Sequence, residues 1–341
     1  MKVIGMPLLS SIALSAYTDL VRLLKDDAFS GIEGKPALKR RGDKAYLYAA
    51  RRVGLGMRFI YIGEDNAETC TRIDRIEELR ALRKERQAAR SRLVRLLRAE
   101  GMTPTDRATG SILSAMAQAG MFRSGGTLVG TNAFRLYEGE LGIRLPPSSV
   151  ATTEEIDIAP FQKLSVALED RVGPGLTETF SALKFDPLPG TTPGRTWRWA
   201  QGGSGQLVEF LTPTFGEETI RNLPALGVSA QALSHLNFLI SDPIHAAVIY
   251  RAGMLVQVPR PERYAMHKLI VADRRREGTG SVKASKDREQ AAFLIEAMAE
   301  ERPDDLILAY RSAMEIGPRW REHLARSLKL MPDTMRILET L

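Results

Sequence analysis

Short apolar runs in the middle of the chain predict strands, and apolar residues at helical spacing on either side of them predict helices. Strands are expected at residues 127–129, 153–159, 206–211 and 254–258, with further apolar runs at 238–240 and 246–250. Helices are expected at residues 15–28, 66–100, 108–122, 133–141, 160–171, 260–276 and 283–298, with three short ones in 304–341. Residues 187–205, rich in Pro and Gly, read as a loop.

The strand predicted at 153–159 carries two acids on one face. Side chains alternate along a strand, so Glu155 and Asp157 point one way while Ile156 and Ile158 point into a core. Two carboxylates on one face repel each other, and a divalent cation with oxygen ligands is the usual partner for such a pair. The pattern therefore suggests a metal site, and a solvated acidic face is the alternative.

A glycine ends the apolar run at 127–129 and suggests a phosphate site. We expect Gly130 and Thr131 to form a turn and residues 133–141 to form a helix that points its N-terminus at this turn. Free N–H groups and the helix dipole would then meet a triphosphate, with the side chain of Thr131 or Asn132 adding a polar contact. A capped surface helix is the alternative.

These motifs resemble the polymerase-β-like nucleotidyltransferases. In that superfamily a glycine turn holds the triphosphate, an acid-apolar-acid strand binds two Mg²⁺ ions, and a later strand supplies a third acid, whose place Glu209 takes here. The string Gly-Thr-Asn-Ala-Phe, followed by Tyr137 and Thr-x-x-Ile-Asp-Ile-Ala, resembles a narrower bacterial nucleotidyltransferase-like family. The resemblance runs from about residue 46 to about residue 294. It implies an α+β fold with a mixed sheet flanked by helices.

The resemblance also implies which residues work together. Glu155, Asp157 and Glu209 would be the catalytic acids and the ligands of one or two Mg²⁺ ions, with an NTP as substrate. The family usually has Asp at the first and third acid positions, where this chain has Glu. The longer side chains would shift a bound metal and reduce or retune activity.

A second resemblance covers the helices after residue 260. The pattern His-Lys-Leu, Arg, then Lys-x-x-Lys-Asp-x-x-Gln is similar to the helical half of abortive-infection and toxin nucleotidyltransferases. It implies that Lys268 and Lys286 hold the triphosphate and that Asp287 orients one of them, and it raises the question of a neutralising antitoxin partner. A plain surface pair is the alternative for Lys286 and Asp287.

The N-terminal third has the composition of a nucleic-acid surface. Residues 1–120 hold 22 Lys and Arg against 14 Asp and Glu, whereas the remainder holds 26 against 27, so this third carries the whole net charge of +7. A basic segment beside a neutral core implies a polyanionic partner, most simply RNA such as a tRNA end.

Two elements carry this basic character. Aromatic runs at residues 44–53 and 57–63 around a glycine turn predict a hairpin, with a loop at residues 31–36 before it. Its aromatic side chains suit base stacking, or they pack the hairpin on its neighbour. From Arg80 to Arg98, the helix predicted at 66–100 bears eight basic residues against Glu85 alone and suits a phosphate backbone, or it pairs with acids elsewhere in the fold: Arg80, Arg83, Lys84, Arg86, Arg90, Arg92, Arg95 and Arg98.

A Trp-Arg-Trp sequence lies in the loop predicted at 187–205. Two indoles around a guanidinium, Trp197, Arg198 and Trp199, could stack a base near the active site. Alternate strand residues that pack a core are the other interpretation.

The cysteine content and the lengths of the apolar runs indicate where the protein is expected in the cell. Cys70 is the single cysteine, which excludes an internal disulfide framework and fits a reducing cytosol. No apolar run approaches the ~18 residues of a membrane span, and we read the first residues as an amphipathic helix rather than an export signal. We therefore expect a cytoplasmic protein.

We expect three regions: a basic N-terminal region over 1–107, a nucleotidyltransferase core over 108–258 and a helical C-terminal domain over 259–341. The expected activity is metal-dependent transfer of a nucleoside monophosphate to an acceptor hydroxyl, most simply on RNA. A nucleic-acid-binding protein with a weak or inactive site, and transfer to a protein hydroxyl, are the alternatives.

Overall fold

A mixed sheet of nine strands forms the centre of the protein. The computed structural model describes residues 7–30, 35–41, 44–53, 56–75, 82–146, 155–160, 176–189, 195–224, 226–276 and 280–341. Seven strands follow the order β11-β12-β4-β5-β8-β10-β9, and β7 joins β6 to β8. The strands are β4 (Gly126–Val129), β5 (Glu155–Pro160), β6 (Phe185–Pro187), β7 (Arg198–Gln201), β8 (Leu207–Pro213), β9 (Ile220–Leu223), β10 (Val228–Leu233), β11 (Ile244–Val248) and β12 (Met254–Val258).

The middle of the sheet combines both strand directions. β5 runs parallel to β8 and antiparallel to β4, and β8 runs parallel to β10. This confirms the predicted mixed sheet and the strands expected near residues 127, 155, 207 and 254. The run at 238–240 instead forms a short helix, α9 (Leu236–Ile240), whereas 246–250 lies largely in β11.

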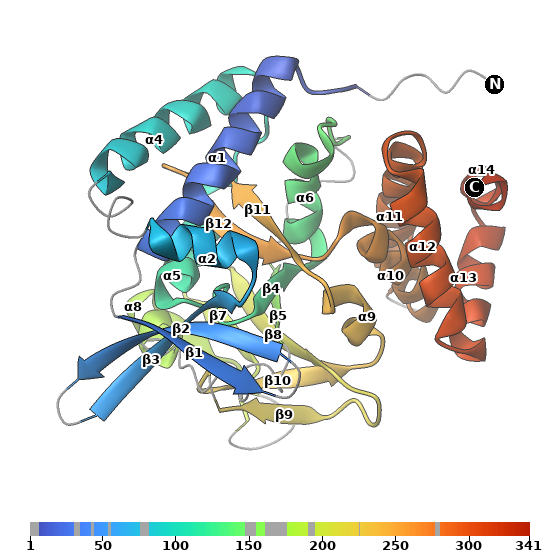
Figure 1. Ribbon diagram of the computed structural model, residues 1–341. Coiled ribbons are helices and arrows are strands. Elements are labelled where there is room, and N and C mark those ends of the chain that lie inside the picture. The colour runs from blue at the N-terminus through green and yellow to red at the C-terminus, as the bar shows by residue number, and fades with distance from the viewer. Residues whose placement is uncertain are drawn as a thin grey trace.

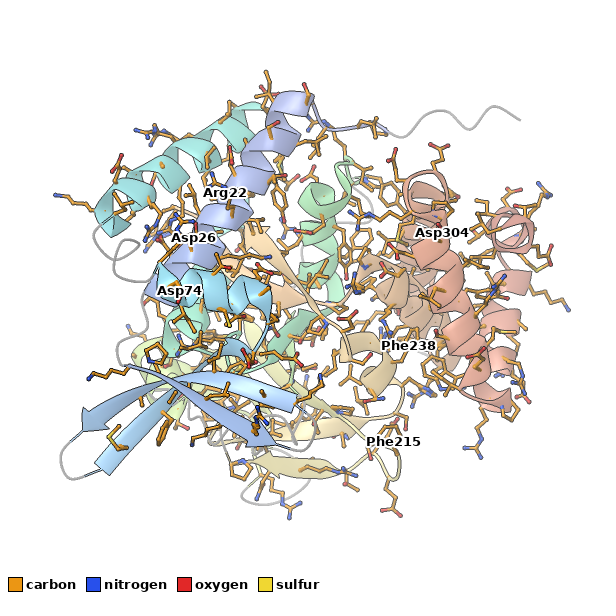
Figure 2. All side chains as sticks on the ribbon, in the orientation of Figure 1. Arg22, Asp26, Asp74, Phe215, Phe238 and Asp304 are labelled. Carbon is orange, nitrogen blue, oxygen red and sulfur yellow. The ribbon has the colours of Figure 1, made fainter. Side chains whose placement is uncertain are left out.

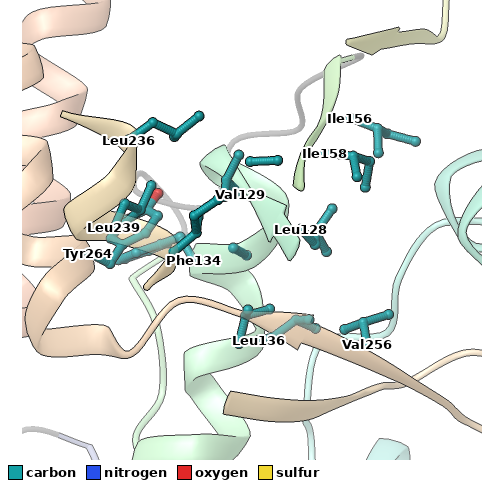
Figure 3. Packing of buried hydrophobic residues seen from close by; sticks show 14 of the residues in the cluster. Leu128, Val129, Phe134, Leu136, Ile156, Ile158, Leu236, Leu239, Val256 and Tyr264 are labelled. Atoms are coloured by element: carbon teal, nitrogen blue, oxygen red, sulfur yellow. The ribbon is translucent and has the colours of Figure 1, made fainter. Parts of the chain in front are cut away.

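One face of the central strands is wholly apolar. Ile156 and Ile158 of β5, with Val208 and Phe210 of β8, are fully buried. Phe210 packs on Phe180 of α8 (Leu176–Ala182), with ring centroids 5.9 Å apart. Figure 3 shows Ile156 and Ile158 beside Leu128 of β4 in this layer. The alternation therefore buries one face and leaves the other for polar side chains.

Helices after residue 260 pack on the same core. The segment contains α10 (Pro261–Arg274), α11 (Ser281–Glu301), α12 (Pro303–Glu315), α13 (Pro318–Lys329) and α14 (Pro332–Thr340). Four of them begin with proline, which lacks the N–H that a first helical turn leaves unused. Leu306, Leu324 and Leu338 are buried in one hydrophobic cluster with the sheet. Figure 1 shows these helices gathered on one side of the sheet.

The N-terminal helices cover another part of the sheet. α1 (Ser11–Ser30) packs along α4 (Arg83–Ala99) and against β11 and β12, as Figure 1 shows. Arg86 and Arg90 of α4 pair with Asp27 of α1 at 2.6 and 2.9 Å. Pairing inside the fold, the alternative considered for the basic helix, therefore applies to these two arginines.

The helix predicted over 66–100 is divided. α2 (Ala67–Asp74) begins at an Asn66 cap and ends at Arg75, where ψ is 4°, and α4 starts only at Arg83. The prediction of one continuous helix was therefore wrong. Figure 2 labels Asp74 on α2 just below Arg22 and Asp26 on α1.

The predicted hairpin is present, but as part of a larger sheet. β2 (Lys44–Val53) pairs antiparallel with β3 (Gly56–Glu64), and β1 (Lys35–Arg41) pairs with the other edge of β2. The prediction of a loop over residues 31–36 was therefore wrong from Lys35 on, where β1 begins. A small cluster of Leu47, Ala49 and Ile62 packs on Ile73 of α2.

The helices around the glycine turn complete the core. α5 (Arg107–Ala119) precedes β4, and α6 (Gly130–Leu141) follows it directly, three residues earlier than predicted. The helix predicted over 160–171 lies outside the described residues after Pro160. The loop predicted over 187–205 contains β7. No helix in the described ranges is both long and apolar enough to cross a bilayer.

Candidate active site

Two acids from distant parts of the chain lie side by side in the sheet. β5 and β8 are parallel, and their register pairs Asp157 with Glu209. Paired residues on neighbouring strands point to the same face. Glu155, two positions before Asp157, lies on that face as well. The structure therefore brings the three predicted acids to one face of the sheet, which we call the acid face.

Burial and mutual repulsion oppose ionisation on the acid face. Burial, followed by the charges of Glu209 and Glu155, raises the pKa of Asp157 to about 7. Burial also raises the pKa of Glu209, against the opposite effect of Arg198. Carboxyl groups crowded in this way would be relieved by a cation between them.

Both glutamates of the acid face already have a cationic partner. Glu155 Oε1 lies 3.2 Å from Lys283 Nζ of α11, and Glu209 Oε1 lies 2.8 Å from Arg198 Nε of β7. Among the described residues, no three His, Cys, Asp or Glu side chains are grouped closely enough to hold a metal ion. The oxygen donors suit Mg²⁺ in kind, but the glutamates would have to leave their partners to join Asp157.

Gly130 stands against the acid face, and two features require a glycine there. Its φ is +66°, a left-handed conformation that other residues adopt at a cost, and a Cβ at this position would overlap Asp157 Oδ2. The Tyr264 hydroxyl of α10 lies 2.9 Å from Gly130 O, and Figure 3 shows Tyr264 beside Phe134 of α6. The first turn of α6 therefore begins in contact with the acids.

The two residues after Gly130 lie in that first helical turn. Asn132 is buried, and its Nδ2 donates to Glu155 O at 2.8 Å. This bond ties α6 to the start of β5 and uses the amide that was expected to face a triphosphate. Thr131 is half-buried in the same turn.

A cavity of about 530 Å³ adjoins the acid face. β5, β7 and β8 line it on one side and α10 and α11 on the other, and its volume is in the range of small-molecule sites. Five cationic side chains line it: Arg198, Lys268, Arg274, Arg275 and Lys283. A larger cavity of about 650 Å³ between α1, β3 and the turn after β11 contains none of the three acids. We therefore place the candidate site at the smaller cavity.

The two predicted phosphate lysines occupy different positions. Lys268 lines the cavity, and its Nζ is 2.5 Å from Asp287 Oδ1 of α11. Arg275 binds the other oxygen of Asp287 at 2.8 Å. Of the described lysines on α11, Lys283 rather than Lys286 lines the cavity. Burial, followed by the charge of Lys268, lowers the pKa of Lys286.

The Trp-Arg-Trp sequence is divided between the core and the cavity. Trp199 is buried, and its ring centroid lies 5.1 Å from that of Phe180, so it packs the core. Trp197 and Arg198 line the cavity, and the Arg198 guanidinium lies 5.1 Å from the Trp197 ring. Alternation along β7 (Arg198–Gln201) places Arg198 and Trp199 on opposite faces, and Trp197, which precedes the strand, lies on the cavity side.

Sequence reasoning did not assign several cavity residues. Arg274 and Arg275 end α10, and Lys283 lies one helical turn before Lys286, so basic residues near the helix ends were the available signal. His267 also lines the cavity, and burial, followed by the charge of Lys268, lowers its pKa to about 3. Its imidazole is therefore neutral at ordinary pH.

Comparisons with known proteins relate the chain to nucleotidyltransferases. A family model described as nucleotidyltransferase matches residues 107–315, from the start of α5 to the end of α12, which include every candidate site residue. Among solved structures, an antigenic nucleotidyltransferase-like protein from Paracoccidioides brasiliensis is 14% identical, with a TM-score of 0.38 over 70% of this chain and 95% of that chain. No curated protein matches the chain.

Proposed function

This chain belongs to the nucleotidyltransferase family, and we propose that it transfers a nucleoside monophosphate from an NTP to an acceptor hydroxyl with Mg²⁺ as cofactor. The observation that carries this proposal is the register of β5 and β8, which sets Asp157 beside Glu209 on the face that bears Glu155. Gly130 keeps the start of α6 against the same acids.

The acid face would provide the metal site. Glu155, Asp157 and Glu209 would hold Mg²⁺, which when bound supplies charge neutralisation at the reacting phosphate. The raised pKa of Asp157 supports this, because burial and the charges of Glu209 and Glu155 disfavour its ionised form when no cation lies between the three carboxylates.

The residues around the cavity would bind the triphosphate and guide the transfer. N–H groups at the start of α6 and Lys268 in the cavity bind phosphate oxygens, and Lys286, one helical turn after the cavity residue Lys283, is the second lysine that we propose to contact the triphosphate. The acceptor oxygen forms a bond to the α-phosphorus, the bond from that phosphorus to the bridging oxygen breaks, and pyrophosphate leaves. Glu209 accepts the hydroxyl proton of the acceptor.

RNA is the acceptor that the N-terminal helices favour. Arg92, Arg95 and Arg98 of α4 are exposed and form no ion pair with any residue that the structure describes. They recur every three positions and follow one side of the helix. Exposed cations in a row attract a phosphate backbone without reading its sequence.

The activity test is incorporation of label from each of the four NTPs into RNA, with Mg²⁺ or with a chelator. We expect incorporation that requires Mg²⁺ and is lost in Asp157→Ala. Absence of product with every nucleotide, or full activity in Asp157→Ala, would contradict the proposed reaction.

The acceptor is tested by the salt dependence of RNA binding. The triple variant R92Q/R95Q/R98Q should make the slope of log K against log salt about 2 units less negative, since each phosphate contact on single strands contributes about 0.7. The control R311Q/R319Q/K329Q removes three exposed charges from α12 and α13 and should leave the slope unchanged. Equal slopes for both triple variants would argue against α4 as the RNA surface.

One observation favours a second candidate, a binding protein without turnover. Both glutamates of the acid face are paired with cations instead of being grouped around Asp157. Calorimetry separates the two functions: Mg²⁺-NTP binding that is lost in Glu155→Gln and Glu209→Gln, without product from the wild type, would favour the binding protein. Transfer to a protein hydroxyl needs the same core, and salt-dependent RNA binding would argue against it.

A further inference from the structure

The cations around the cavity fall into two groups by their partners. Lys268 and Arg275 are held by Asp287, and Arg274 is held by Glu218 at 3.0 Å. Arg198 and Lys283 instead pair with Glu209 and Glu155, which are proposed metal ligands. The second group therefore occupies carboxylates that a metal ion would need.

The formal charges of the five cations that line the cavity and of the five carboxylates that face them cancel without a metal ion. Five cations line the cavity, and five carboxylates face them, three on the acid face and two behind the cations: Glu155, Asp157, Glu209, Glu218 and Asp287. A divalent ion that binds the acid face must therefore displace cations from it or be repelled by them.

Exposure and the identity of the partner together show which cations can exchange with a metal ion: Arg275 is 45% exposed, but its carboxylate, Asp287, is not a proposed metal ligand. The side chains of Arg198 and Lys283 are 42% and 61% exposed, so each can leave its glutamate and remain hydrated. Lys268 and Asp287 are 10% and 4% exposed, and separating them would leave buried charges unpaired, which is costly. Lys268 is therefore a fixed cation, and Arg198 and Lys283 are exchangeable ones.

The pairing of β7 with β8 places Arg198 where this exchange can occur. β7 pairs antiparallel with β8, and the register sets Arg198 directly opposite Glu209, the arrangement in which cross-strand charges interact best. Its guanidinium also lies over the ring of Trp197, which lines the cavity. Arg198 is thus held between an acid and an aromatic ring, both of them within the site.

We propose that Arg198 and Lys283 are positioning residues that neutralise Glu209 and Glu155 in the empty site and transfer to the phosphates of the nucleotide when a divalent metal takes those carboxylates. This inference rests on the proposed function. It also gives a reason for Glu at the first and third acid positions: a longer side chain reaches a cation on a neighbouring element.

The exchange couples metal and nucleotide binding. Metal binding releases two cations, and the released cations strengthen nucleotide binding; by linkage the nucleotide strengthens metal binding to the same extent. Removing Arg198 should therefore have opposite effects on the two ligands. If Arg198 only bound phosphate, its removal would leave the affinity for metal alone unchanged. If Arg198 were purely structural, its removal would weaken the binding of both ligands.

The test measures binding of Mn²⁺ alone, by electron paramagnetic resonance, and binding of a non-hydrolysable NTP with Mg²⁺, by calorimetry. Arg198→Gln should bind Mn²⁺ alone about two- to fivefold more tightly, the range of a partly exposed ion pair, and the nucleotide more weakly. Lys283→Gln should change both affinities in the same directions by smaller factors, because its pair is more exposed.

Two control variants make the result specific. Arg274→Gln removes the same charge from the same cavity, but from an arginine that is held by Glu218. Its effect on Mn²⁺ affinity therefore measures the general electrostatic potential of the cavity. This effect should be smaller than that of Arg198→Gln. Arg198→Lys keeps the charge and should restore wild-type Mn²⁺ affinity.

Three results would overturn the proposal. They are equal effects in Arg198→Gln and Arg274→Gln, unchanged or weaker Mn²⁺ binding in Arg198→Gln, and tighter nucleotide binding in that variant. If instead the wild type binds neither Mn²⁺ nor Mg²⁺-NTP, the proposed function fails as well, so the two failures are distinguishable.

Discussion

At the scale of single residues, Asp157 is kept at the site at the expense of stability. Its pKa in the folded chain, about 7, lies above the ordinary aspartate value. Its contribution to stability is therefore fully present below about pH 4 and is lost as the pH rises through 7, by an amount on the order of 4 kcal/mol. An acid with this profile is explained by function rather than by folding.

Asp157→Asn should therefore be inactive and yet more stable than the wild type at alkaline pH. Thermal unfolding in chelator from pH 5 to pH 8.5 should show a difference in melting temperature that grows up to about pH 7 and then levels off, because only the wild type loses the contribution of Asp157 and the loss is complete above its folded pKa. Millimolar Mg²⁺ should stabilise the wild type and not the variant. A wild type that melts above Asp157→Asn at pH 8 in chelator would show that Lys268 and Arg275 already compensate the charge.

Gly130 provides the second prediction at this scale. Gly130→Ala should destabilise the fold by about 2 kcal/mol or more, from the left-handed φ and from overlap with Asp157, and should abolish transfer. Gly203→Ala is the matched control, because Gly203 has a φ of +84° with no atom within 4 Å of a Cβ. It should lose about 1 kcal/mol of stability and keep its activity. Equal losses of activity would mean that backbone strain, not contact with Asp157, is what matters.

The residues of the acid face could be predicted from the sequence, but their partners could not. Acid-apolar-acid spacing fixes the side of β5 on which Glu155 and Asp157 lie, whatever the rest of the fold. The pairing of Arg198 with Glu209 depends on the register of β7 against β8, and no local pattern encodes that register. The glycine turn was predicted, but its contact with Asp157 needed the three-dimensional structure.

At the scale of elements, prolines and alternation made most predictions accurate. Pro261, Pro303, Pro318 and Pro332 mark four helix starts, and alternation marks β5 and β8. The break between α2 and α4 was missed, because apolar positions keep helical spacing across it and no Gly or Pro interrupts residues 66–100. β1 was missed because it is a polar and basic edge strand, with little alternation of apolar and polar residues to indicate it.

The contact between α10 and α11 depends on a buried ion pair. Asp287→Leu should destabilise the protein by about 3–5 kcal/mol, because Lys268 would remain buried without its carboxylate. The double variant K268M/D287L should recover much of this loss, since neither charge then remains. Chemical unfolding of the two single variants and the double variant gives the coupling energy directly.

Additive losses in this cycle would show that the pair contributes nothing specific to the contact. Asp304→Leu is the matched control: Asp304 is an exposed acid in the first turn of α12, labelled in Figure 2. Its replacement should cost less than about 1 kcal/mol.

At the scale of the whole molecule, hydrophobic burial is unevenly distributed. One cluster joins the sheet, α5, α6 and the helices after residue 260, whereas in the described part of the β1–β3 sheet Leu47, Ala49 and Ile62 form a separate small cluster packed on Ile73. A second cluster joins α1 and α4 to Ala247 and Ile249. The proposed catalytic centre thus lies in the best-packed part, and the basic region is attached through smaller cores.

Hydrogen exchange followed by mass spectrometry should reproduce this order, because local opening is easier where fewer apolar side chains are buried. Amides of β4, β5 and β8 should exchange most slowly, those of α1 and α4 next, and those of β1–β3 fastest. Mg²⁺ with a non-hydrolysable NTP should slow exchange at the start of α6 and in α11 without affecting β1–β3, whereas RNA should slow exchange in α4. If β1–β3 exchange as slowly as β5, the small cluster is not what limits their stability. If RNA protects α13 rather than α4, the electrostatic assignment of the acceptor surface is wrong even though the acid face remains in place.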